Sequence, residues 1–354
     1  MNHLSRRALM ATSTLALLGA SAAYAQGPTS NPTETLVPSS PRKIAAMGLA
    51  ALEILDALGI EAAIVPAPPA ADANMRWPDA LAKKYASDSY VKLVSAGGRS
   101  APQNAPNPQV EQLKSLKPDV IVLDSRSRGL QDQLKSIAPV VELGISNTSL
   151  VDSVVQNILT VGAAFGKERQ AIEKANALLD DVRAVREAAA RQGTGLVLFG
   201  VGNRVMPQQI GARFGMLYDV IGIRPVLLPG EGEGLSTGRP SASIPEDADA
   251  ATKAAAEAAR QTQQAAEARY FAEVMARDPK WLFVVDRNAA FGPAKAAEAM
   301  AATPVISNST AWKQNKVIYL DQGGAAWYTM AGSLGLLETS LRRIKAEFEK
   351  HEGR

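Results

Sequence analysis

Two arginines follow predicted strands at matching positions in the two halves of the chain. Pro118 precedes an apolar stretch and then Arg126, and Pro279 precedes a second apolar stretch and then Arg287. Proline and arginine are eight residues apart in both cases. Ligands of open α/β sheets bind at the carboxyl ends of strands and in the crevice between domains. The two guanidinium groups are therefore predicted to face one shared site.

Arg213 is a third candidate, because it follows the predicted loop 201–211 and precedes a predicted helix. A guanidinium group is permanently charged and presents a rigid fork of hydrogen-bond donors, which suits an anionic ligand rich in oxygen. The alternative for any single arginine is a salt bridge on the surface. The matched positions of Arg126 and Arg287 favour a binding role for these two.

Two aromatic residues, Trp327 and Tyr328, follow a predicted strand and the glycine turn Gly323–Gly324. Aromatic rings at the edge of a cleft can pack against planar rings of a ligand. Such residues also fit core positions, and the sequence leaves both interpretations open for Trp327 and for Tyr328.

The chain has few groups for metal binding or nucleophilic catalysis. Its two histidines are His3 and His351, and it has no cysteine. Zinc and manganese sites built from histidine and cysteine are thus nearly excluded, as are Ser-His-Asp and Cys-His catalytic groups. We therefore expect neither a resident metal or cofactor nor enzymatic chemistry.

One long helix is predicted between the two halves. The segment Lys167–Gln192 contains no glycine or proline and consists mostly of strong helix formers. Its apolar residues recur every three or four positions, at Ile172, Ala175, Leu178, Leu179, Val182, Val185 and Ala189. At 1.5 Å per residue this helix is roughly 39 Å long, enough to span a domain.

The sequences on either side of this helix resemble each other. Asp56–Pro66 and Asp219–Pro229 place Asp, Gly and Pro at the same offsets, and the proline-to-arginine spacing repeats after them in the same order. These repeats predict an α/β fold of two similar Rossmann-like lobes joined by one long helix.

The first 25 residues fit a secretory signal peptide. Arg6 and Arg7 precede a short apolar run and an A-x-A pattern at Ala23–Ala25, and the run is too short to span a bilayer. The arginine pair also fits a twin-arginine signal, so Sec and twin-arginine export both stay open. Without cysteine we expect a soluble periplasmic protein that is not a lipoprotein. Removal of Arg6 and Arg7 leaves 36 basic against 35 acidic residues, which gives no argument for nucleic acid as a partner.

Composition suggests further boundaries along the chain. Residues 26–41 are expected to form a loose tail, residues 42–148 the first lobe, residues 149–192 the helical link, and residues 193–350 the second lobe. Residues 245–270 are rich in Ala, Glu, Gln and Arg. We interpret them as a solvated helix or a mobile insertion, either a surface extension or a handle for a partner.

Five motifs cover both halves in order: PRKIAAMGLAALEILDALGI, NPQVEQLKSLKPDVIVLDSRSRGLQDQLKSIAP, ARFGMLYDVIGI, WLFVVDRNAAFGP and VIYLDQGGAAWY. Each is weak alone. Together they resemble the helical-backbone substrate-binding proteins of ABC importers, which are periplasmic binding proteins. Within that group the chain is similar to the ferric catecholate siderophore binders of the petrobactin and enterobactin type.

The resemblance implies that Arg126, Arg213 and Arg287 form a basic triad for a ferric siderophore, with Tyr328 beside it. The siderophore would supply the iron ligands itself. Some relatives place a histidine in a loop that corresponds here to Leu235–Pro240, which has none. The expected direct iron ligand is therefore absent from that loop, and Arg239 could add a fourth charge instead. Arg99, in a glycine-rich loop, is a weaker candidate of the same kind.

The resemblance also implies a partner, an inner-membrane ABC permease with its ATPase. The family docks on the permease through one acidic residue in each lobe, and Glu111 and Asp219 match these positions. Either residue could instead be a solvated helix charge. We further expect a monomer.

The expected function is therefore uptake of an anionic ferric siderophore, bound between the lobes with small lobe closure. The alternatives are binding of haem, a cobalamin, or a hydroxamate or carboxylate siderophore. A periplasmic hydrolase and an interaction protein that uses residues 245–270 are the rivals from other classes.

Overall fold

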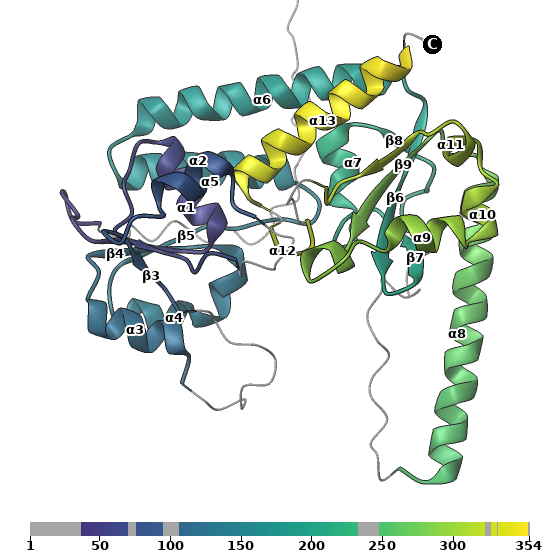
Figure 1. The fold of residues 1–354 in the computed structure, drawn as a ribbon, viewed down its shortest axis with the longest axis horizontal. Helices are drawn as coiled ribbons and strands as arrows, with labels where there is room; N and C mark the ends of the chain where they lie inside the picture. Colours follow the sequence, from purple (N-terminus) through teal and green to yellow (C-terminus); the bar gives the residue numbers. More distant parts are fainter. Residues whose placement is uncertain are drawn as a thin grey trace, which may run out of the picture. The chain divides into compact units, whose positions relative to one another are not determined.

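The computed structural model describes residues 37–69, 76–94, 106–232, 248–322, 327–330 and 332–352. The predicted signal peptide, Arg99, Arg239 and the loop Leu235–Pro240 lie outside these residues. The chain forms two β-sheets, one drawn from each half of the sequence, with helices packed around both (Figure 1).

The first sheet is parallel throughout, with strand order β3-β2-β1-β4-β5. Its strands are β1 (Ile44–Met47), β2 (Ile64–Val65), β3 (Val91–Lys92), β4 (Val120–Leu123) and β5 (Val140–Glu142). The two central strands β1 and β4 consist only of buried residues, because helices cover both faces of a parallel sheet.

Alternate residues of these strands enter two different hydrophobic cores. Ala45, Met47 and Ile121 pack with helices α3 (Pro108–Leu116) and α4 (Gln131–Lys135) on one face. On the other face, Ile44, Ala46 and Val122 belong to a core that includes α1 (Leu49–Ala57) and α5 (Leu150–Ala164) and continues into the second sheet.

The second sheet has strand order β10-β9-β6-β7, with β8 also paired to β6. Its strands are β6 (Thr194–Val201), β7 (Arg204–Pro207), β8 (Arg224–Pro225), β9 (Trp281–Asp286) and β10 (Val317–Tyr319). Strand β7 is antiparallel to β6 and returns through the two-residue turn Gly202–Asn203, whereas β8, β9 and β10 pair in parallel. The antiparallel hairpin differs from the predicted loop at 201–211.

The remaining helices connect and cover these sheets. They are α2 (Asp79–Lys84), the 3₁₀ helix η1 (Ser125–Leu130), α6 (Glu168–Ala190), α7 (Met216–Ile221), α8 (Ala250–Ala276), the 3₁₀ helix η2 (Asn288–Ala290), α9 (Ala296–Ala301), α10 (Pro304–Ser307), α11 (Thr310–Lys313), α12 (Trp327–Met330) and α13 (Leu334–Glu352).

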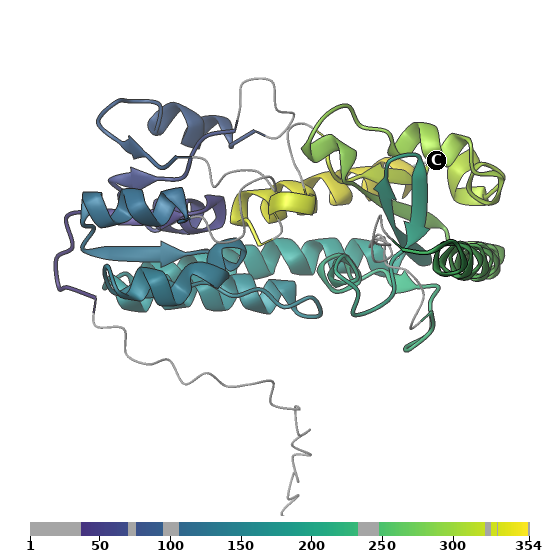
Figure 2. The same ribbon diagram turned by 90° about the horizontal axis from the view of Figure 1, so that it is seen from below.

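Helix α6 is the predicted long helix, and it packs against α5 and α13 (Figures 1 and 2). Lys174 on α6 and Arg191 directly after it form salt bridges with Glu338 and Glu352 on α13. The core cluster on the inner side of these helices contains residues of both sheets. The two halves are thus joined by shared packing as well as by the chain.

The buried face of α6 differs from the predicted stripe at Ile172 and at Leu179, which is only partly buried. Ala175, Leu178, Val182, Val185 and Ala189 are buried as expected, but the side chain of Ile172 is exposed. Ala171 is buried instead and packs closely on α5, where a Cβ on Gly162 would lie only 2.3 Å from the Ala171 Cβ. Such a close helix contact accepts only small residues.

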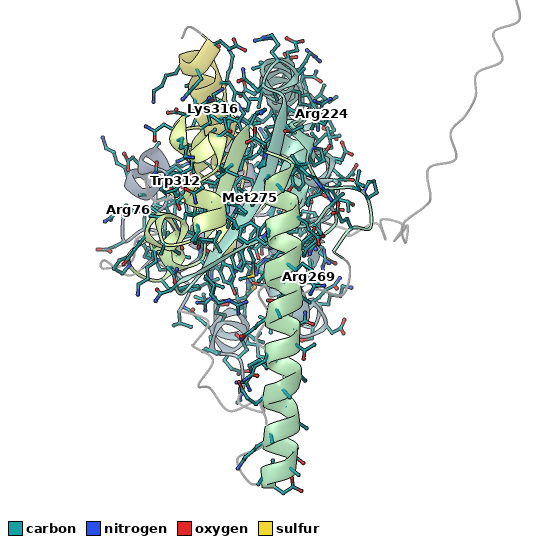
Figure 3. The ribbon with its side chains drawn as sticks, turned by 90° about the vertical axis from the view of Figure 1, so that its right-hand side faces the viewer. Arg76, Arg224, Arg269, Met275, Trp312 and Lys316 are labelled. Carbon is teal, nitrogen blue, oxygen red and sulfur yellow. The ribbon has the colours of Figure 1, made fainter. Side chains whose placement is uncertain are left out.

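The Ala-rich segment forms the 27-residue helix α8, which extends away from the second sheet (Figures 1 and 3). Its last turns pack against the second half of the chain through buried Tyr270, Phe271, Val274 and Met275. Alanine-rich sequences are intrinsically helical, so the exposed turns need no packed face to form.

Candidate functional site

Arg126 is positioned by the end of strand β4. The carboxylate of Asp124 accepts hydrogen bonds from the backbone NH groups of Arg126 (3.1 Å) and Ser127 (3.3 Å), and so caps η1. The exposed Arg126 then donates from Nη1 to the carbonyl of Thr329 at 2.9 Å. This contact brings an arginine of the first half of the chain to helix α12, 203 residues away.

Asp124 occupies space that only a glycine at position 48 leaves open. Gly48 has φ 116°, and a Cβ built there would lie 1.7 Å from Asp124 Oδ2. The carboxyl group is buried, and burial raises the pKa of Asp124 to about 6.

We expect Gly48→Ala to unfold at a much lower temperature than Gly59→Ala, a matched control. Gly59 also has positive φ (68°), but a Cβ at that position would have nothing within 4 Å, so that variant measures the cost of a side chain at positive φ, about 1 kcal/mol, without a clash. Gly48→Ala adds loss of the Asp124 cap, a further ~1–2 kcal/mol, and a steric clash. Equal thermal unfolding midpoints for the two variants would contradict this role of Gly48.

Arg287 is positioned in the same way at the end of β9. Its backbone NH donates to the carbonyl of Gly200 on β6 at 2.9 Å. The preceding Asp286 accepts hydrogen bonds from the backbone NH groups of Asn288, Lys295 and Ala296, which fixes the turn. The predicted equivalence of the two strand ends therefore has a common cause, a buried aspartate at the end of the strand that holds the turn.

Arg213 approaches from the segment before α7. Its Nη2 donates to the carbonyl of Tyr328, and its Cζ lies 4.4 Å from the centroid of the Tyr328 ring. The Cζ of Arg287 lies 5.3 Å from the same ring. Arg126, Arg213 and Arg287 thus meet around α12, and we call these three residues the arginine cluster.

Tyr328 is the centre of an aromatic group. Its ring is parallel to that of Phe199 at 6.0 Å and lies 6.4 Å from Phe214, both of which are buried behind it. Phe291 contacts it edge-on at 5.7 Å and is 63% exposed. Hydrogen bonds from Arg287, the larger effect, and from Arg213 lower the pKa of Tyr328 below its usual value.

Trp327 lies next to Tyr328 in the sequence but points into the core. It is fully buried, and its Nε1 donates to Ser340 Oγ on α13 at 3.1 Å. Its backbone NH donates to Asp321 Oδ1 at 2.6 Å, and Asp321 Oδ2 accepts from the backbone NH of Asp286. Trp327 therefore anchors α12, and we leave it out of the proposed ligand contacts.

A second buried acid fixes the chain after α12. Glu53 on α1 accepts hydrogen bonds through Oε2 from Ser333 Oγ and from the backbone NH of Gly335, at the start of α13. Its other oxygen has no hydrogen-bond partner among the described residues. Burial raises the pKa of Glu53 to about 7 and that of Asp321 to about 7. Asp321 and Glu53 thus hold the two ends of the segment that presents Tyr328.

The arginine cluster has no carboxylate partner in the part of the chain that the structure describes. Within the described part of the chain, none of its three guanidinium groups forms a salt bridge with a carboxylate. Two of them donate instead to backbone carbonyls. Three positive charges beside an aromatic group can bind an anion that carries rings.

The two acids predicted to dock on a permease lie on different helices. Glu111 is exposed on α3 and pairs with Lys114 of the same helix at 2.7 Å. Asp219 on α7 is half-exposed and pairs with Arg186 of α6 at 2.9 Å. Arg186 also donates to the Asp219 carbonyl, so this pair holds α7 on the long helix.

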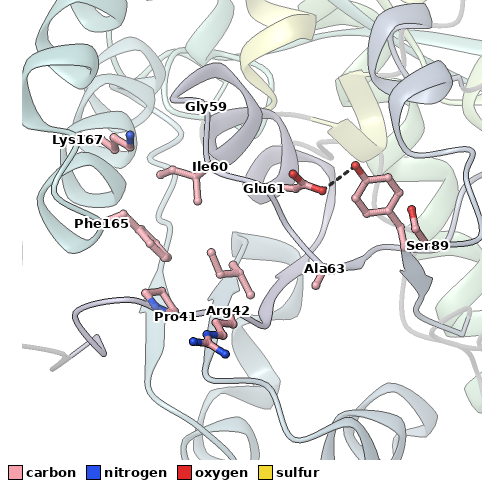
Figure 4. Close-up of a pocket in the computed structure, with 11 residues that line it drawn as sticks. Pro41, Arg42, Gly59, Ile60, Glu61, Ala63, Ser89, Phe165 and Lys167 are labelled. Atoms are coloured by element: carbon pink, nitrogen blue, oxygen red, sulfur yellow. Dashed lines mark hydrogen bonds between the residues drawn. The ribbon is translucent and has the colours of Figure 1, made fainter.

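Two cavities lie elsewhere. One, of about 440 Å³, has walls that include Arg42, Glu61, Phe165 and Lys167 (Figure 4), with Tyr90 donating to Glu61 at 2.9 Å. The other, of about 380 Å³, lies between β7 and α8. Neither is lined by the arginine cluster. Among the described residues no group of His, Cys, Asp or Glu is placed to hold a metal, and no helix is long and apolar enough to cross a membrane.

A Ser-His-Asp triad needs a histidine as its base, and the described residues offer no suitable one. One Gly-x-Ser-x-Gly pattern occurs at Gly234–Gly238, outside these residues. The histidine that they do contain, His351, is half-buried on α13, where its Nδ1 lies 3.0 Å from the Glu347 carbonyl and its ring packs on Trp281.

A match to a protein family and the similarity to two named proteins agree with each other. Residues 44–323 match the family described as periplasmic binding protein. The petrobactin-binding protein YclQ of Bacillus subtilis is 24% identical over 317 residues, which cover 89% of this chain and 85% of YclQ. The ferric-anguibactin-binding protein FatB of Vibrio anguillarum is 24% identical over 314 residues, which cover 86% and 82% of the two chains.

Solved structures share the fold. The crystal structure of YclQ has a TM-score of 0.64 at 21% identity, with 88% of this chain and 94% of YclQ covered. The catecholate-siderophore binding protein VctP of Vibrio cholerae has a TM-score of 0.64 at 21% identity, with 88% and 95% covered. These similarities confirm the predicted fold class, two α/β halves joined by a long helix.

Proposed function

The chain belongs to the periplasmic binding protein family. We propose that it binds an anionic ferric siderophore of the catecholate type for an ABC importer. The family assignment confirms the resemblance inferred from the motifs. It also agrees with the expectation of a solute-binding protein rather than an enzyme, because the relatives above are named as binding proteins.

The observation that carries this proposal is the arginine cluster. Its guanidinium groups have no salt-bridge partner within the described residues and surround the ring of Tyr328. A ferric tris-catecholate bears a charge of about −3, which three arginines can neutralise while their planar groups stack on the catechol rings. We assign ligand contact to Arg126, Arg213, Arg287 and Tyr328, with Arg99 and Arg239 as further candidates.

A carboxylate siderophore is the strongest alternative, because it is anionic too. One of the relatives is an Fe(3+)-citrate-binding protein of Bacillus subtilis, 31% identical over 142 residues that cover 40% of each chain. A neutral hydroxamate complex fits the cluster less well, since it gives the arginines nothing to neutralise. Haem and cobalamin remain alternatives that the same titration tests.

The test is quenching of tryptophan fluorescence by a ferric tris-catecholate, ferric citrate, a neutral ferric hydroxamate, haem and a cobalamin. We expect tight quenching by the catecholate complex and a decrease in its affinity as salt concentration rises, because the attraction is between opposite charges. Binding confined to the neutral hydroxamate would leave the fold unchanged and refute the proposed cargo.

We further place the protein in the periplasm as a monomer that delivers its cargo to a permease. Glu111 and Asp219 would dock on this permease; exposed charges of this kind govern orientation and association rate more than affinity. Charge reversal at Glu111 should therefore lower uptake by cells while cargo affinity of the purified protein stays unchanged. A loss of cargo affinity would assign Glu111 to folding or to the ligand site.

We place the lobe boundaries near residues 148 and 193 and propose small closure on cargo binding. The core that includes α1, α5, α6 and residues of both sheets supports this, since a shared core resists hinge rotation. X-ray scattering with and without cargo measures it directly. A large decrease in the radius of gyration on binding would contradict the proposal.

A further inference from the structure

An exposed aromatic side chain lies beside the arginine cluster. Phe291 follows η2 and is 63% exposed, although large apolar residues are normally buried. Its ring contacts two members of the site, with the Arg287 Cζ at 5.1 Å and the Tyr328 ring at 5.7 Å and 73°. No periodic pattern in the sequence marks this residue, because it stands in a turn before Gly292 and Pro293.

The backbone that presents Phe291 is well fixed. Its NH donates to the Asn288 carbonyl at 3.0 Å. The Asn288 side chain exchanges two hydrogen bonds with the backbone of Gly202 in the β6–β7 hairpin, and the Asn288 NH donates to Asp286. An aromatic ring on an ordered turn loses little conformational freedom when it binds a partner, which makes it an efficient contact.

We propose that Phe291 is a specificity-determining residue that packs on an aromatic ring of the cargo and selects catecholate over carboxylate ferric siderophores. This inference rests on the proposed function. The arginines attract both classes through charge alone, so charge cannot separate them. A second property is needed to separate the two classes of siderophore. Phe291 supplies it as an apolar aromatic surface beside Arg287, the arginine that would hold a catecholate oxygen.

Arg287 takes part in both recognition by charge and recognition by aromatic contact. Its guanidinium group lies within 5.3 Å of the centroids of both the Phe291 and the Tyr328 rings, which stand roughly at right angles. A catechol ring bound through its oxygens to Arg287 would meet the face or edge of Phe291. A citrate chelate presents carboxylates and methylenes there and cannot make the aromatic contact.

Other exposed apolar side chains provide a matched control. Leu228 is 64% exposed, almost the same fraction as Phe291, and as an aliphatic residue it cannot form an aromatic or cation–π pair with Arg287 or Tyr328. Leu228→Ala therefore removes a similar exposed apolar surface but no aromatic ring. Phe291→Leu keeps an apolar side chain and removes only the aromatic ring.

The experiment measures the dissociation constants of ferric tris-catecholate and of ferric citrate for wild type, Phe291→Ala, Phe291→Leu and Leu228→Ala. We expect Phe291→Ala to bind the catecholate complex about tenfold more weakly, with Phe291→Leu intermediate. Binding of ferric citrate should change less than about threefold, and Leu228→Ala should match wild type for both ligands.

The outcomes separate this inference from the proposed function. Suppose that wild type binds the catecholate complex, and that Phe291→Ala weakens binding of both ligands equally or of neither. Phe291 then does not set specificity, but the cargo assignment stands. If wild type prefers ferric citrate, or binds neither complex, the proposed cargo is wrong and the role of Phe291 falls with it.

Discussion

Replacing Arg213 and Arg287 together by alanine is expected to weaken binding of a trianionic ferric catecholate by about 10²–10⁴-fold. A hydrogen bond to a charged partner contributes about 1.5–3 kcal/mol, and two such groups are removed. Both guanidinium groups lie against the Tyr328 ring, at 4.4 and 5.3 Å. The single substitutions should therefore not be additive, because the two arginines share a neighbour.

Lysine substitutions separate charge from geometry at these positions. Arg213→Lys with Arg287→Lys keeps both charges but loses the planar forks, and we expect a loss of about tenfold. Arg183→Ala is the matched control, because Arg183 is exposed on α6 and, among the described residues, forms a salt bridge with Asp180 alone. Fluorescence titration measures all variants, and circular dichroism checks that each is folded.

Two results would contradict the site. Equal affinity of the double alanine variant and wild type would show that the cargo binds elsewhere. A loss that is equally large for a neutral chelate would show that the substitutions disturb the fold near α12. An unchanged affinity in Arg183→Ala is required for either conclusion.

The strand ends that carry Arg126 and Arg287 could be predicted from sequence, because their position depends on local order alone. In each case an apolar strand is followed by an aspartate that caps the next turn, and the aspartate is part of the pattern. For Arg213 the sequence indicates only an arginine before a helix. Its contact with the Tyr328 carbonyl, 115 residues away, leaves no local signal.

Neighbouring aromatic residues show a limit of sequence analysis. Trp327 and Tyr328 are adjacent, yet one is fully buried and the other faces two arginines. Helix α12 has only four residues, too few for a periodic pattern to separate its faces. What orients it is the hydrogen bond from the Trp327 NH to Asp321 and that from Ser333 to Glu53.

Other features carry signals in the sequence that point to their structure. The hairpin β6–β7 turns at Gly202–Asn203, a residue pair typical of two-residue hairpin turns, and Gly202 has the positive φ (59°) that such turns require. Glu53 stands within an otherwise apolar run of α1, and an acid on a buried face indicates a specific partner.

The second large effect concerns pH, and it originates at Glu53. We expect the wild-type protein to lose stability as pH rises from about 5 to about 8. Burial raises the pKa of Glu53 from 4.5 to about 7, so the folded state binds a proton in this range that the unfolded state has released. Stability must then fall with rising pH, by about 3 kcal/mol for this group once pH exceeds about 7.

Other acids also make the stability of the protein fall as pH rises. Glu338 on α13 raises the pKa of Glu53 further, although Lys174 of α6 pairs with Glu338 at 2.6 Å. Asp321 and Asp124, whose pKa values are raised to about 7 and about 6, add to the loss at high pH. Acids with lowered pKa values, among them the half-exposed Asp119 and Asp278, lose their favourable contacts only at lower pH, as they become protonated.

Glu53→Gln tests the assignment to this one residue. The amide oxygen can still accept from Ser333 and Gly335, and no charge is buried at any pH. The variant should match wild type near pH 5 and exceed it by about 3 kcal/mol in free energy of unfolding near pH 8, as measured by urea denaturation. Asp321→Asn is less suitable, because each oxygen of Asp321 accepts a backbone hydrogen bond and an amide would lose one.

Glu111→Gln is the control that removes an exposed carboxyl group in place of a buried one. Glu111 is exposed and forms a surface pair with Lys114, so its substitution should leave the pH dependence of stability unchanged. If Glu53→Gln keeps the wild-type slope between about pH 5 and pH 8, the buried carboxyl is not the group that titrates. If Glu53→Gln flattens the slope of unfolding free energy against pH, the hydrogen bonds from α13 to Glu53 on α1 are most stabilising when Glu53 is protonated. The segment that presents Tyr328 is then most firmly fixed below about pH 7.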